Sequence, residues 1–238
     1  MTAAPRGHVL ALDSSTAVGS VAIGEGGELR AEIVLRVGAG HSQALLPAID
    51  RAVSIAGITP GDLRAVVVGA GPGSFTGVRI GAATAKGIVH ALGIPLFAYS
   101  SLLVGAGGCW GAEGSVCALF DARRRDVFAA CYRFAAGVEE VYAPEALSLD
   151  ALLDRFREGN PPIFTGEGAV LHREEIGRVI GARVMPPLLS TPRASVLLAL
   201  LEAVPEMGRV EDAAAWEPEY LRASGAERIA AAAGGGAS

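Results

Sequence analysis

The sequence predicts an α/β fold built from two related lobes, each a mixed sheet flanked by helices. Its first half alternates short apolar runs, typical of strands, with two segments whose apolar residues recur at helical spacing. A similar cycle begins again near Ser115. The 238 residues are 51% hydrophobic and 5% aromatic, with 32 glycines, and this composition suits tightly packed helices on sheets rather than an aromatic-lined ligand cavity. The length allows one large domain or two small ones, each with a core.

The first half predicts three strands, then a helix, a strand, a second helix and a further strand. Gly24 to Gly27 forms a hairpin signal between the second and third strands. A glycine-rich loop, Gly69–Gly73, opens the second helix. The strands are expected at His8–Asp13, Val18–Ile23, Leu29–Leu35, Ala65–Val68 and Ile94–Ala98, and the helices at Ser42–Ala56 and Thr76–Leu92.

The second half repeats the opening of the first. Leu10–Asp13 and Ala118–Asp121 are both strand patterns that end in aspartate before a short turn and another strand. Two copies of this order describe the actin-like ATPase fold (ASKHA, RNase H-like). The expected lobes span residues 1–104 and 105–223, and residues 224–238, rich in Ala and Gly, are expected to form a disordered tail. The remaining elements are strands at Val116–Phe120 and Val127–Phe134, and helices at Leu149–Glu158, Glu167–Ile176 and Pro192–Val204.

Charge and cysteine content restrict the possible partners and compartment. A net charge of −5 argues against a broad electrostatic grip on nucleic acid. The cysteines Cys109, Cys117 and Cys131 lack C-x-x-C spacing, and we interpret them as buried, reduced thiols. Neither a signal peptide pattern nor an uncharged apolar run of about 18 residues is evident. The sequence therefore predicts a soluble, cytoplasmic protein without a membrane span.

The segment Gly69–Gly81 is the strongest local motif. A glycine-rich turn between a strand and a helix can bind phosphate through converging backbone N–H groups. The spacing fits neither of the two common phosphate-binding motifs. A Walker A loop ends in Gly-Lys-Ser/Thr, but the first lysine after these glycines is Lys86, inside the helix. The dinucleotide-binding motif G-x-G-x-x-G needs a glycine at its last position, where this sequence has Ser74 or Thr76. We therefore favour a tight, close-packed turn in which Ser74 or Thr76 caps the helix.

Asp13 and Asp121 are the candidate acids, each at the carboxyl end of a strand. In a nuclease of related fold, several such carboxylates converge on two metal ions, but the strand Ala65–Val68 supplies no acid. Capping of the turn after each strand is therefore the favoured role. Arg123–Arg125 is interpreted as a solvated hairpin turn, and the four histidines lack metal-binding spacing. No catalytic residue and no metal site is predicted.

The two helices of the first half carry more apolar surface than one sheet can bury. On Thr76–Leu92 the Arg, Lys and His side chains share one stripe, and the uncharged arc covers roughly 220°, against about 100° for an ordinary surface helix. On that arc Gly77, Gly81 and Ala85 stand at four-residue steps, which would let another backbone approach closely. About half of the surface of Ser42–Ala56 is also apolar. This excess predicts a second partner, either the other lobe or another subunit.

Five segments together resemble one known family, in the family's order and over nearly the whole chain except the tail. They are Leu10–Thr16 (LALDSST), His41–Pro47 (HSQALLP), Gly71–Gly81 (GPGSFTGVRIG), Asp121–Arg124 (DARR) and Tyr220–Arg222 (YLR). The block Gly71–Gly81 is highly specific, and the others are modest alone. On these motifs the sequence resembles the TsaB (YeaZ) family of subunits for threonylcarbamoyladenosine synthesis in tRNA.

The resemblance implies an actin-like fold with a degenerate nucleotide cleft around Asp13, Ser14, Ser15 and Asp121. It implies a partner, the related transferase TsaD, a TsaE ATPase that docks on the pair, and self-association when the partner is missing. The family's contact surface is built from the two helices of the first lobe. The residues expected there are Leu45, Leu46, Ile49, Val53, Gly77, Gly81, Thr84, Ala85 and Ile88.

The favoured hypothesis is therefore a non-catalytic scaffold that binds and orders a TsaD-like subunit, which modifies adenosine 37 of ANN-decoding tRNAs. It would need no cofactor of its own, would contact tRNA indirectly and would have no peptidase activity. The alternative is an enzyme, an actin-like small-molecule kinase or nucleotide hydrolase that uses Asp13. A third hypothesis, a structure-directed nuclease, lacks converging acids. On the scaffold hypothesis, Gly81→Arg abolishes pairing and leaves the monomer folded.

Overall fold

The computed structural model describes residues 4–36, 40–135 and 137–221, so the predicted tail at residues 224–238 lies outside the described residues. The described strands are β1 (His8–Asp13), β2 (Val18–Glu25), β3 (Glu28–Arg36), β4 (Leu63–Gly69), β5 (Leu96–Tyr99), β6 (Val116–Asp121), β7 (Asp126–Phe134), β8 (Val138–Ser148) and β9 (Ile163–Thr165). The α-helices are α1 (His41–Ile55), α2 (Phe75–Leu92), α3 (Ser101–Gly107), α4 (Leu149–Asp154), α5 (Glu167–Leu171), α6 (Arg173–Ile180), α7 (Ala194–Ala203) and α8 (Pro205–Gly208). Short 3₁₀ turns lie at Pro60–Asp62 and Pro187–Leu189.

The first sheet has the strand order β3-β2-β1-β4-β5. Strands β1 to β3 form an antiparallel meander, and β4 and β5 run parallel to β1. The turn between β2 and β3 lies at Gly26 and Gly27, whose φ angles of 56° and 80° suit glycine. The predicted hairpin is therefore confirmed.

The second sheet, with the order β8-β7-β6-β9, repeats the arrangement β3-β2-β1-β4 of the first. In both sheets three antiparallel strands are followed by a strand parallel to the first of them. This repetition confirms the predicted fold class, two related lobes with mixed sheets flanked by helices. The sequence patterns missed β8 and β9, and the helix predicted at 167–176 is two helices, α5 and α6.

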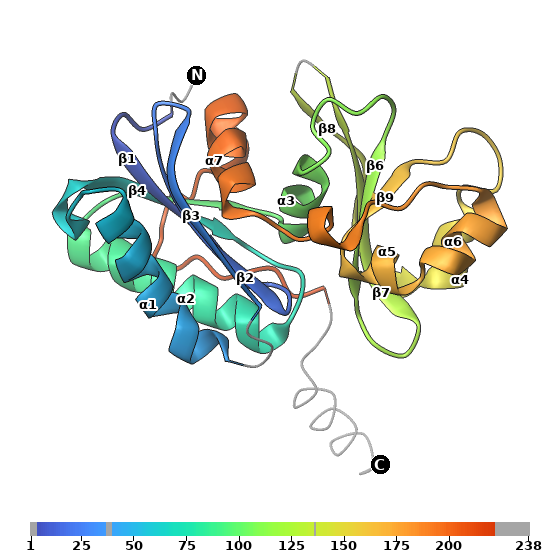
Figure 1. Ribbon diagram of the computed structural model, residues 1–238, viewed down its shortest axis with the longest axis horizontal. Helices are drawn as coiled ribbons and strands as arrows, with labels where there is room; N and C mark the ends of the chain where they lie inside the picture. The colour runs from blue at the N-terminus through green and yellow to red at the C-terminus, as the bar shows by residue number, and fades with distance from the viewer. Residues whose placement is uncertain (1–3, 37–39, 136, 222–238) are drawn as a thin grey trace, which may run out of the picture.

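Three hydrophobic cores alternate with the two sheets (Figure 1). Because side chains alternate along a strand, Leu10 and Leu12 of β1 face the core beneath α1 and α2, whereas Val9 and Ala11 face the central core. The central core holds α3 and α7 between the two sheets, and α4, α5 and α6 cover the outer face of the second sheet. The elements thus stack as helices, sheet, helices, sheet, helices.

The predicted lobe boundary is wrong for the last part of the chain. Helix α7, assigned from sequence to the second lobe at 105–223, packs on β1 and β2 of the first sheet (Figure 1). The Ala194 N–H donates to Ser20 Oγ (2.9 Å), and the Tyr99 hydroxyl donates to the Val204 carbonyl (3.1 Å). Residues 209–221 then run along the first lobe, where the Val210 N–H donates to the Leu96 carbonyl (3.2 Å). The reason is that the apolar face of α7 fills the central core that both sheets share.

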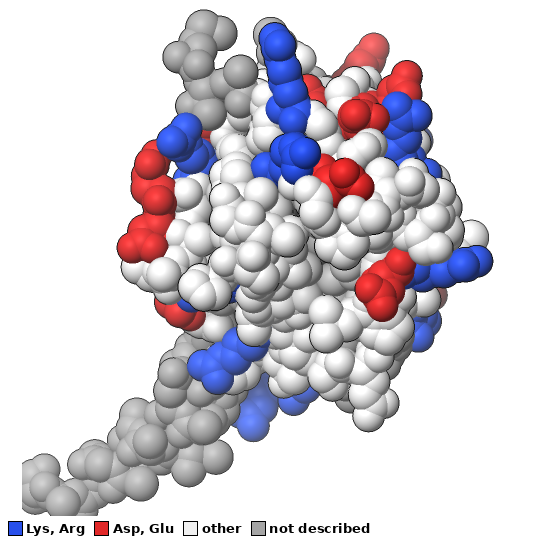
Figure 2. Space-filling model, turned by 90° about the vertical axis from the view of Figure 1, so that its left-hand side faces the viewer, with Lys and Arg blue, Asp and Glu red and all other residues white. Residues whose placement is uncertain are grey.

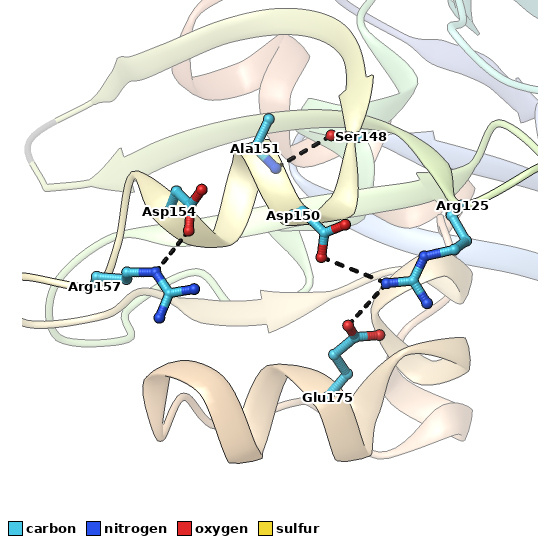
Figure 3. Close-up of polar contacts among 7 residues, drawn as sticks. All are labelled: Arg125, Ser148, Asp150, Ala151, Asp154, Arg157 and Glu175. Atoms are coloured by element: carbon cyan, nitrogen blue, oxygen red, sulfur yellow. Dashed lines mark hydrogen bonds and ion pairs between the residues drawn. The ribbon is translucent and has the colours of Figure 1, made fainter.

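Charged contacts tie the turn after β6 to the helices of the second lobe (Figure 3). Arg125 contacts Glu175 of α6 (2.9 Å) and Asp150 of α4 (3.5 Å). The Arg123 N–H donates to Asp121 Oδ1 (2.8 Å), which caps the turn. The predictions of a solvated basic turn and of a capping role for Asp121 are both confirmed.

The cysteine interpretation is wrong for two of the three thiols. Cys117 and Cys131 are paired positions on β6 and β7, and they form a disulfide that cysteine spacing alone did not indicate. Cys109 is free and buried, as expected, and burial raises the pKa of its thiol.

None of the helices in the described part of the chain is both long enough and apolar enough to cross a bilayer.

Candidate functional site

The glycine-rich loop closes against the turn that follows β1. The Ser74 N–H donates to the Ser15 carbonyl (2.6 Å), and Ser14 Oγ donates to the Gly77 carbonyl (2.8 Å). A Cβ atom at Gly73 would overlap the Ser15 carbonyl oxygen, and one at Gly77 would overlap the Ser14 carbonyl oxygen. Ser74 caps α2, since its Oγ accepts from the Gly77 N–H (3.3 Å). The interpretation of a close-packed turn with a capping serine is confirmed.

Asp13 lies beneath this loop and is 1% exposed. Its Oδ1 accepts from the Ser15 N–H (2.9 Å) and from Ser15 Oγ (2.7 Å). Its Oδ2 accepts from Ser101 Oγ (2.7 Å), and Ser101 Oγ accepts from the Gly71 N–H (3.1 Å). Asp13 therefore holds the end of β1, the glycine-rich loop and the start of α3 together. The predicted role in capping the turn after β1 is confirmed.

A cavity of about 410 Å³ lies between the two lobes. Its walls come from the turn at 16–17, the loop at 72–76, the turn at 121–123, Glu167 and the C-terminal segment 219–221. Among the four predicted cleft residues, only Asp121 lines it. Asp13, Ser14 and Ser15 are buried beneath the wall, so the prediction is corrected for these three. The physical reason is the inward packing of α2, which covers the turn after β1.

The electrostatics of this cavity oppose phosphate. Burial raises the pKa of Glu167, and the charge of Asp121 raises it further, while the Ala17 N–H lowers it. Glu219 is a third carboxylate on the wall, and Arg123 is the one lysine or arginine among the described lining residues. Because like charges repel strongly where water is partly excluded, a polyphosphate would meet an unfavourable field here.

Arg79 and Lys86 of α2 contact the C-terminal segment. The Arg79 guanidinium lies 3.8 Å from the centre of the Phe75 ring, and its Nε donates to the Tyr220 hydroxyl (3.3 Å). Lys86 Nζ donates to the Trp216 carbonyl (2.8 Å) and pairs with Glu217 (3.3 Å). The sequence showed the basic stripe, but nothing in it indicated partners more than a hundred residues away.

The small-residue stripe predicted as an interface faces the chain's own sheet. Gly77, Gly81 and Ala85 are buried, and a Cβ atom at Gly81 would lie 2.6 Å from Ser14 Oγ and 3.5 Å from Leu12 Cδ1. Their small size lets α2 approach β1 and its turn. On α1 the predicted interface residues that are also buried in the core are Leu45, Ile49 and Val53. The interface prediction is wrong for these six residues.

The outward surface of these helices is formed by different residues, which we call the outer helix face. Leu46 is 58% exposed, and Thr84 and Ile88 are half-buried, so these three predicted positions do reach the surface. Ala83 and Gly87 are exposed, and no atom lies within 4 Å of a Cβ placed on Gly87. Figure 2 shows the first-lobe side of the molecule, where a broad area without charged side chains is bordered by lysine, arginine and acidic residues.

No metal centre accompanies these features: within the described ranges, no group of three or more His, Cys, Asp or Glu side chains could hold a metal ion.

Two lobes with repeated mixed sheets and a cavity between them define an actin-like ATPase fold. The ethanolamine utilization protein EutJ of Carboxydothermus hydrogenoformans has a similar fold, with a TM-score of 0.53 and 13% identity, over 81% of this chain and 89% of that one.

Comparisons with known proteins identify the family. The chain is 32% identical over 226 residues, 92% of its length and 96% of the relative's, to the tRNA threonylcarbamoyladenosine biosynthesis protein TsaB of Bacillus subtilis. The structure of YeaZ from Pseudomonas aeruginosa matches with a TM-score of 0.75 and 28% identity, over 90% of this chain and all of that one. Residues 36–229 match the family model described as TsaD: tRNA N6-adenosine threonylcarbamoyltransferase. The chain therefore belongs to the TsaB (YeaZ) family, which confirms the resemblance seen in its motifs.

Proposed function

We propose that this chain is a non-catalytic subunit that binds a TsaD-like transferase and orders it for threonylcarbamoyl transfer to adenosine 37 of ANN-decoding tRNAs. The observation that carries the proposal is the outer helix face. There an uncharged surface with small residues at Ala83 and Gly87 would let a partner helix approach closely. The curated relatives named for threonylcarbamoyladenosine biosynthesis support the pathway, and the match to a TsaD family model supports a partner of related fold.

A non-catalytic role is supported by the first-lobe aspartate and by the cavity. Asp13 is buried and accepts hydrogen bonds from Ser15 and Ser101, so it is poorly placed to serve as the base of a kinase or hydrolase. Asp121 and Glu167 line the cavity between the lobes, and their carboxylates would repel a polyphosphate there. We therefore infer that ATP turnover belongs to other subunits of the complex. A peptidase role has only the support of a name, since one similar structure from Pseudomonas aeruginosa is called a protein with similarity to peptidase YEAZ.

The same proposal covers the wider assembly. A TsaE-like ATPase would dock on the pair, and the chain alone would form a homodimer through the outer helix face. With a net charge of −5, the chain would contact tRNA indirectly. Because its substrate is tRNA, the complex would work in the cytoplasm.

Reconstitution tests the proposal directly. The chain, a TsaD-like transferase, a TsaE-like ATPase, tRNA and a threonylcarbamoyl donor are mixed, and the modified nucleoside is measured by mass spectrometry. We expect product only when the chain and the transferase are both present. Asp121→Asn and Glu167→Gln, on the cavity wall, should retain product formation within about twofold.

Two results would contradict the proposal. One is ATP hydrolysis by the chain alone at about 1 per second or faster that Asp121→Asn abolishes. The other is full product formation by the transferase without this chain.

A further inference from the structure

A second cavity, of about 510 Å³, lies at the junction of the two lobes. The first lobe contributes Ser100, at the end of β5, and the second sheet contributes Tyr132 of β7 and Glu140 of β8. The C-terminal segment contributes Trp216 and Glu219. The walls therefore belong to both lobes, and a bound molecule would contact both at once.

Two buried hydroxyl groups on these walls have no hydrogen-bond partner among the described residues. Tyr132 is 2% exposed and its phenolic oxygen is unpaired, and the Ser100 hydroxyl oxygen is also buried and unpaired. Burial raises the pKa of Tyr132, so the phenol stays neutral. The Ser100 hydroxyl is close enough to lower this pKa, but the two groups do not meet hydrogen-bond geometry. An unpaired buried hydroxyl is costly, and a ligand that supplies hydrogen bonds to it therefore gains affinity.

Three glutamates line the same cavity, namely Glu140, Glu217 and Glu219. Neither Glu140 nor Glu219 forms an ion pair with a described lysine, arginine or histidine, although the nearby Glu139 and Glu217 pair with Arg133 (2.7 Å) and Lys86 (3.3 Å). Burial raises the pKa of Glu219, and the charge of Glu140 raises it further. The two groups therefore repel each other across the junction, and a cation between them would relieve that repulsion.

Apart from Glu217, which pairs with Lys86, the remaining lining is mainly apolar and aromatic. Leu103, Pro144 and Leu221 form walls that suit a carbon chain. Within the described residues, no group of three or more His, Cys, Asp or Glu side chains could hold a metal ion. A primary ammonium has three N–H donors and no acceptor, which matches carboxylates and hydroxyl oxygens.

We propose that this cavity binds a primary alkylammonium group. Glu140 and Glu219 neutralise its charge, the hydroxyls of Ser100 and Tyr132 accept its N–H groups, and the alkyl chain lies along the apolar wall. Because the contacts come from both lobes, the ligand holds the lobes together. The proposal is independent of the outer helix face and of the proposed partner.

Titration calorimetry on the full chain tests the site, with putrescine as the probe and 1,4-butanediol as its neutral analogue at constant ionic strength. We expect saturable binding of putrescine with a rise in melting temperature, and neither effect for the diol. Glu140→Gln and Glu219→Gln should each weaken binding about tenfold or more, because each removes a charge-assisted hydrogen bond. Tyr132→Phe should weaken it several-fold and leave folding intact. Glu139→Gln, next to Glu140 on β8, is the matched control and should change affinity less than about twofold.

A second probe, Nα-acetyl-lysine methylamide, separates the two sources of such a group. Binding comparable to that of putrescine assigns the ammonium to a lysine side chain of another protein, and binding of putrescine alone assigns it to a free diamine. The proposal is overturned if neither probe binds, if the diol binds as well as the diamine, or if both carboxylate variants keep wild-type affinity.

Discussion

The two lobes share a sheet topology but differ in the helices that cover their outer faces. In the first lobe, α1 carries Asp50 and Arg51 in 15 residues, and α2 carries Arg79 and Lys86 in 18 residues. In the second lobe, α6 alone carries four charged residues in eight. One outer layer is therefore nearly uncharged and the other is charged.

The use of the charges differs as well. In the second lobe they pair at the surface, as Arg125 does with Glu175 and Asp150 (Figure 3). In the first lobe both cations of α2 bind the C-terminal segment, which leaves the outer helix face clear. Charged residues are depleted in the centre of protein interfaces, so the same topology carries a solvated layer in the second lobe and, on the proposed function, a docking layer in the first.

The largest expected effect comes from Gly81→Arg, which tests which side of α2 faces inward. Because a Cβ atom there lies 2.6 Å from Ser14 Oγ, the new side chain should clash and bury an unpaired charge. We expect a loss of about 4 kcal/mol or more and an unfolded or barely folded chain in thermal denaturation followed by circular dichroism. Gly177→Arg on α6, where a Cβ meets no atom within 4 Å, is the matched control and should melt like the wild type. A normal melting temperature for Gly81→Arg would mean that α2 is turned the other way.

Asp13→Ala and Asp121→Ala compare equivalent strand ends in the two lobes. Asp13 is buried and accepts three hydrogen bonds, so its loss should cost about 3 kcal/mol. Asp121 is exposed and accepts one bond from Arg123, so its loss should cost less than about 1 kcal/mol. Urea unfolding of both variants checks the difference. Equal costs would show that the two strand ends are not distinguished by burial.

Glu32→Gln tests the contact that fastens α7 to the first sheet. Burial raises the pKa of Glu32, but hydrogen bonds from Arg193 (3.2 Å) and Ser195 (3.1 Å) outweigh it, so the pKa falls below its ordinary 4.5. A lowered folded-state pKa stabilises the fold above the unfolded value, and this contribution disappears as the pH falls through the folded-state pKa. The variant should therefore be less stable than the wild type at pH 7, and the difference should shrink below about pH 4.

Glu167→Gln in the second lobe is the opposite case, because the pKa of Glu167 is raised by burial and by Asp121. Its ionised form is disfavoured in the fold, so the variant should gain stability at pH 7 and lose that advantage on acidification. Urea unfolding from pH 7 to pH 3 measures both variants. Parallel pH profiles would contradict the assignment of opposite shifts.

The smallest expected effect is that of Glu175→Gln, which removes one arm of the surface contact at Arg125. Exposed ion pairs contribute little, so the melting temperature should change by no more than about 2 °C, and partner binding should not change. A large loss of partner binding in sedimentation experiments would show that the charged layer also docks.

The five strands of the first sheet and β6 and β7 of the second were predictable, because buried strands in this chain are continuous apolar runs such as Val66–Val68. The edge strand β8 was missed because Glu139, Glu140 and Glu145 interrupt any apolar pattern along it. Helix α3 was missed because the expected lobe boundary, between residues 104 and 105, falls inside it. The disulfide depends on the β6–β7 register, which cysteine spacing alone does not give.

The sequence predicted which two helices carry the candidate docking surface, but not which side of α2 faces outward. The excess uncharged surface of α2 is real, yet the helix has small residues on both sides. Gly77 and Gly81 on one side, and Ala83 and Gly87 on the other, have the same four-residue spacing. The choice between them depends on Ser14, whose backbone and side chain occupy the space beside Gly77 and Gly81. Because Ser14 and these glycines are more than sixty residues apart in the chain, no local sequence pattern indicates the contact.

Sedimentation velocity of the Gly87→Arg chain mixed with a TsaD-like partner tests the proposed docking surface most directly. Gly87 is exposed with open space around it, so arginine should leave the monomer folded, but it would place a bulky charge at the centre of the outer helix face. We expect Gly87→Arg to weaken the complex at least about 100-fold, whereas Gly177→Arg, on the other outer layer, should form it like the wild type. A folded Gly87→Arg chain that pairs with wild-type affinity would contradict docking through the outer helix face.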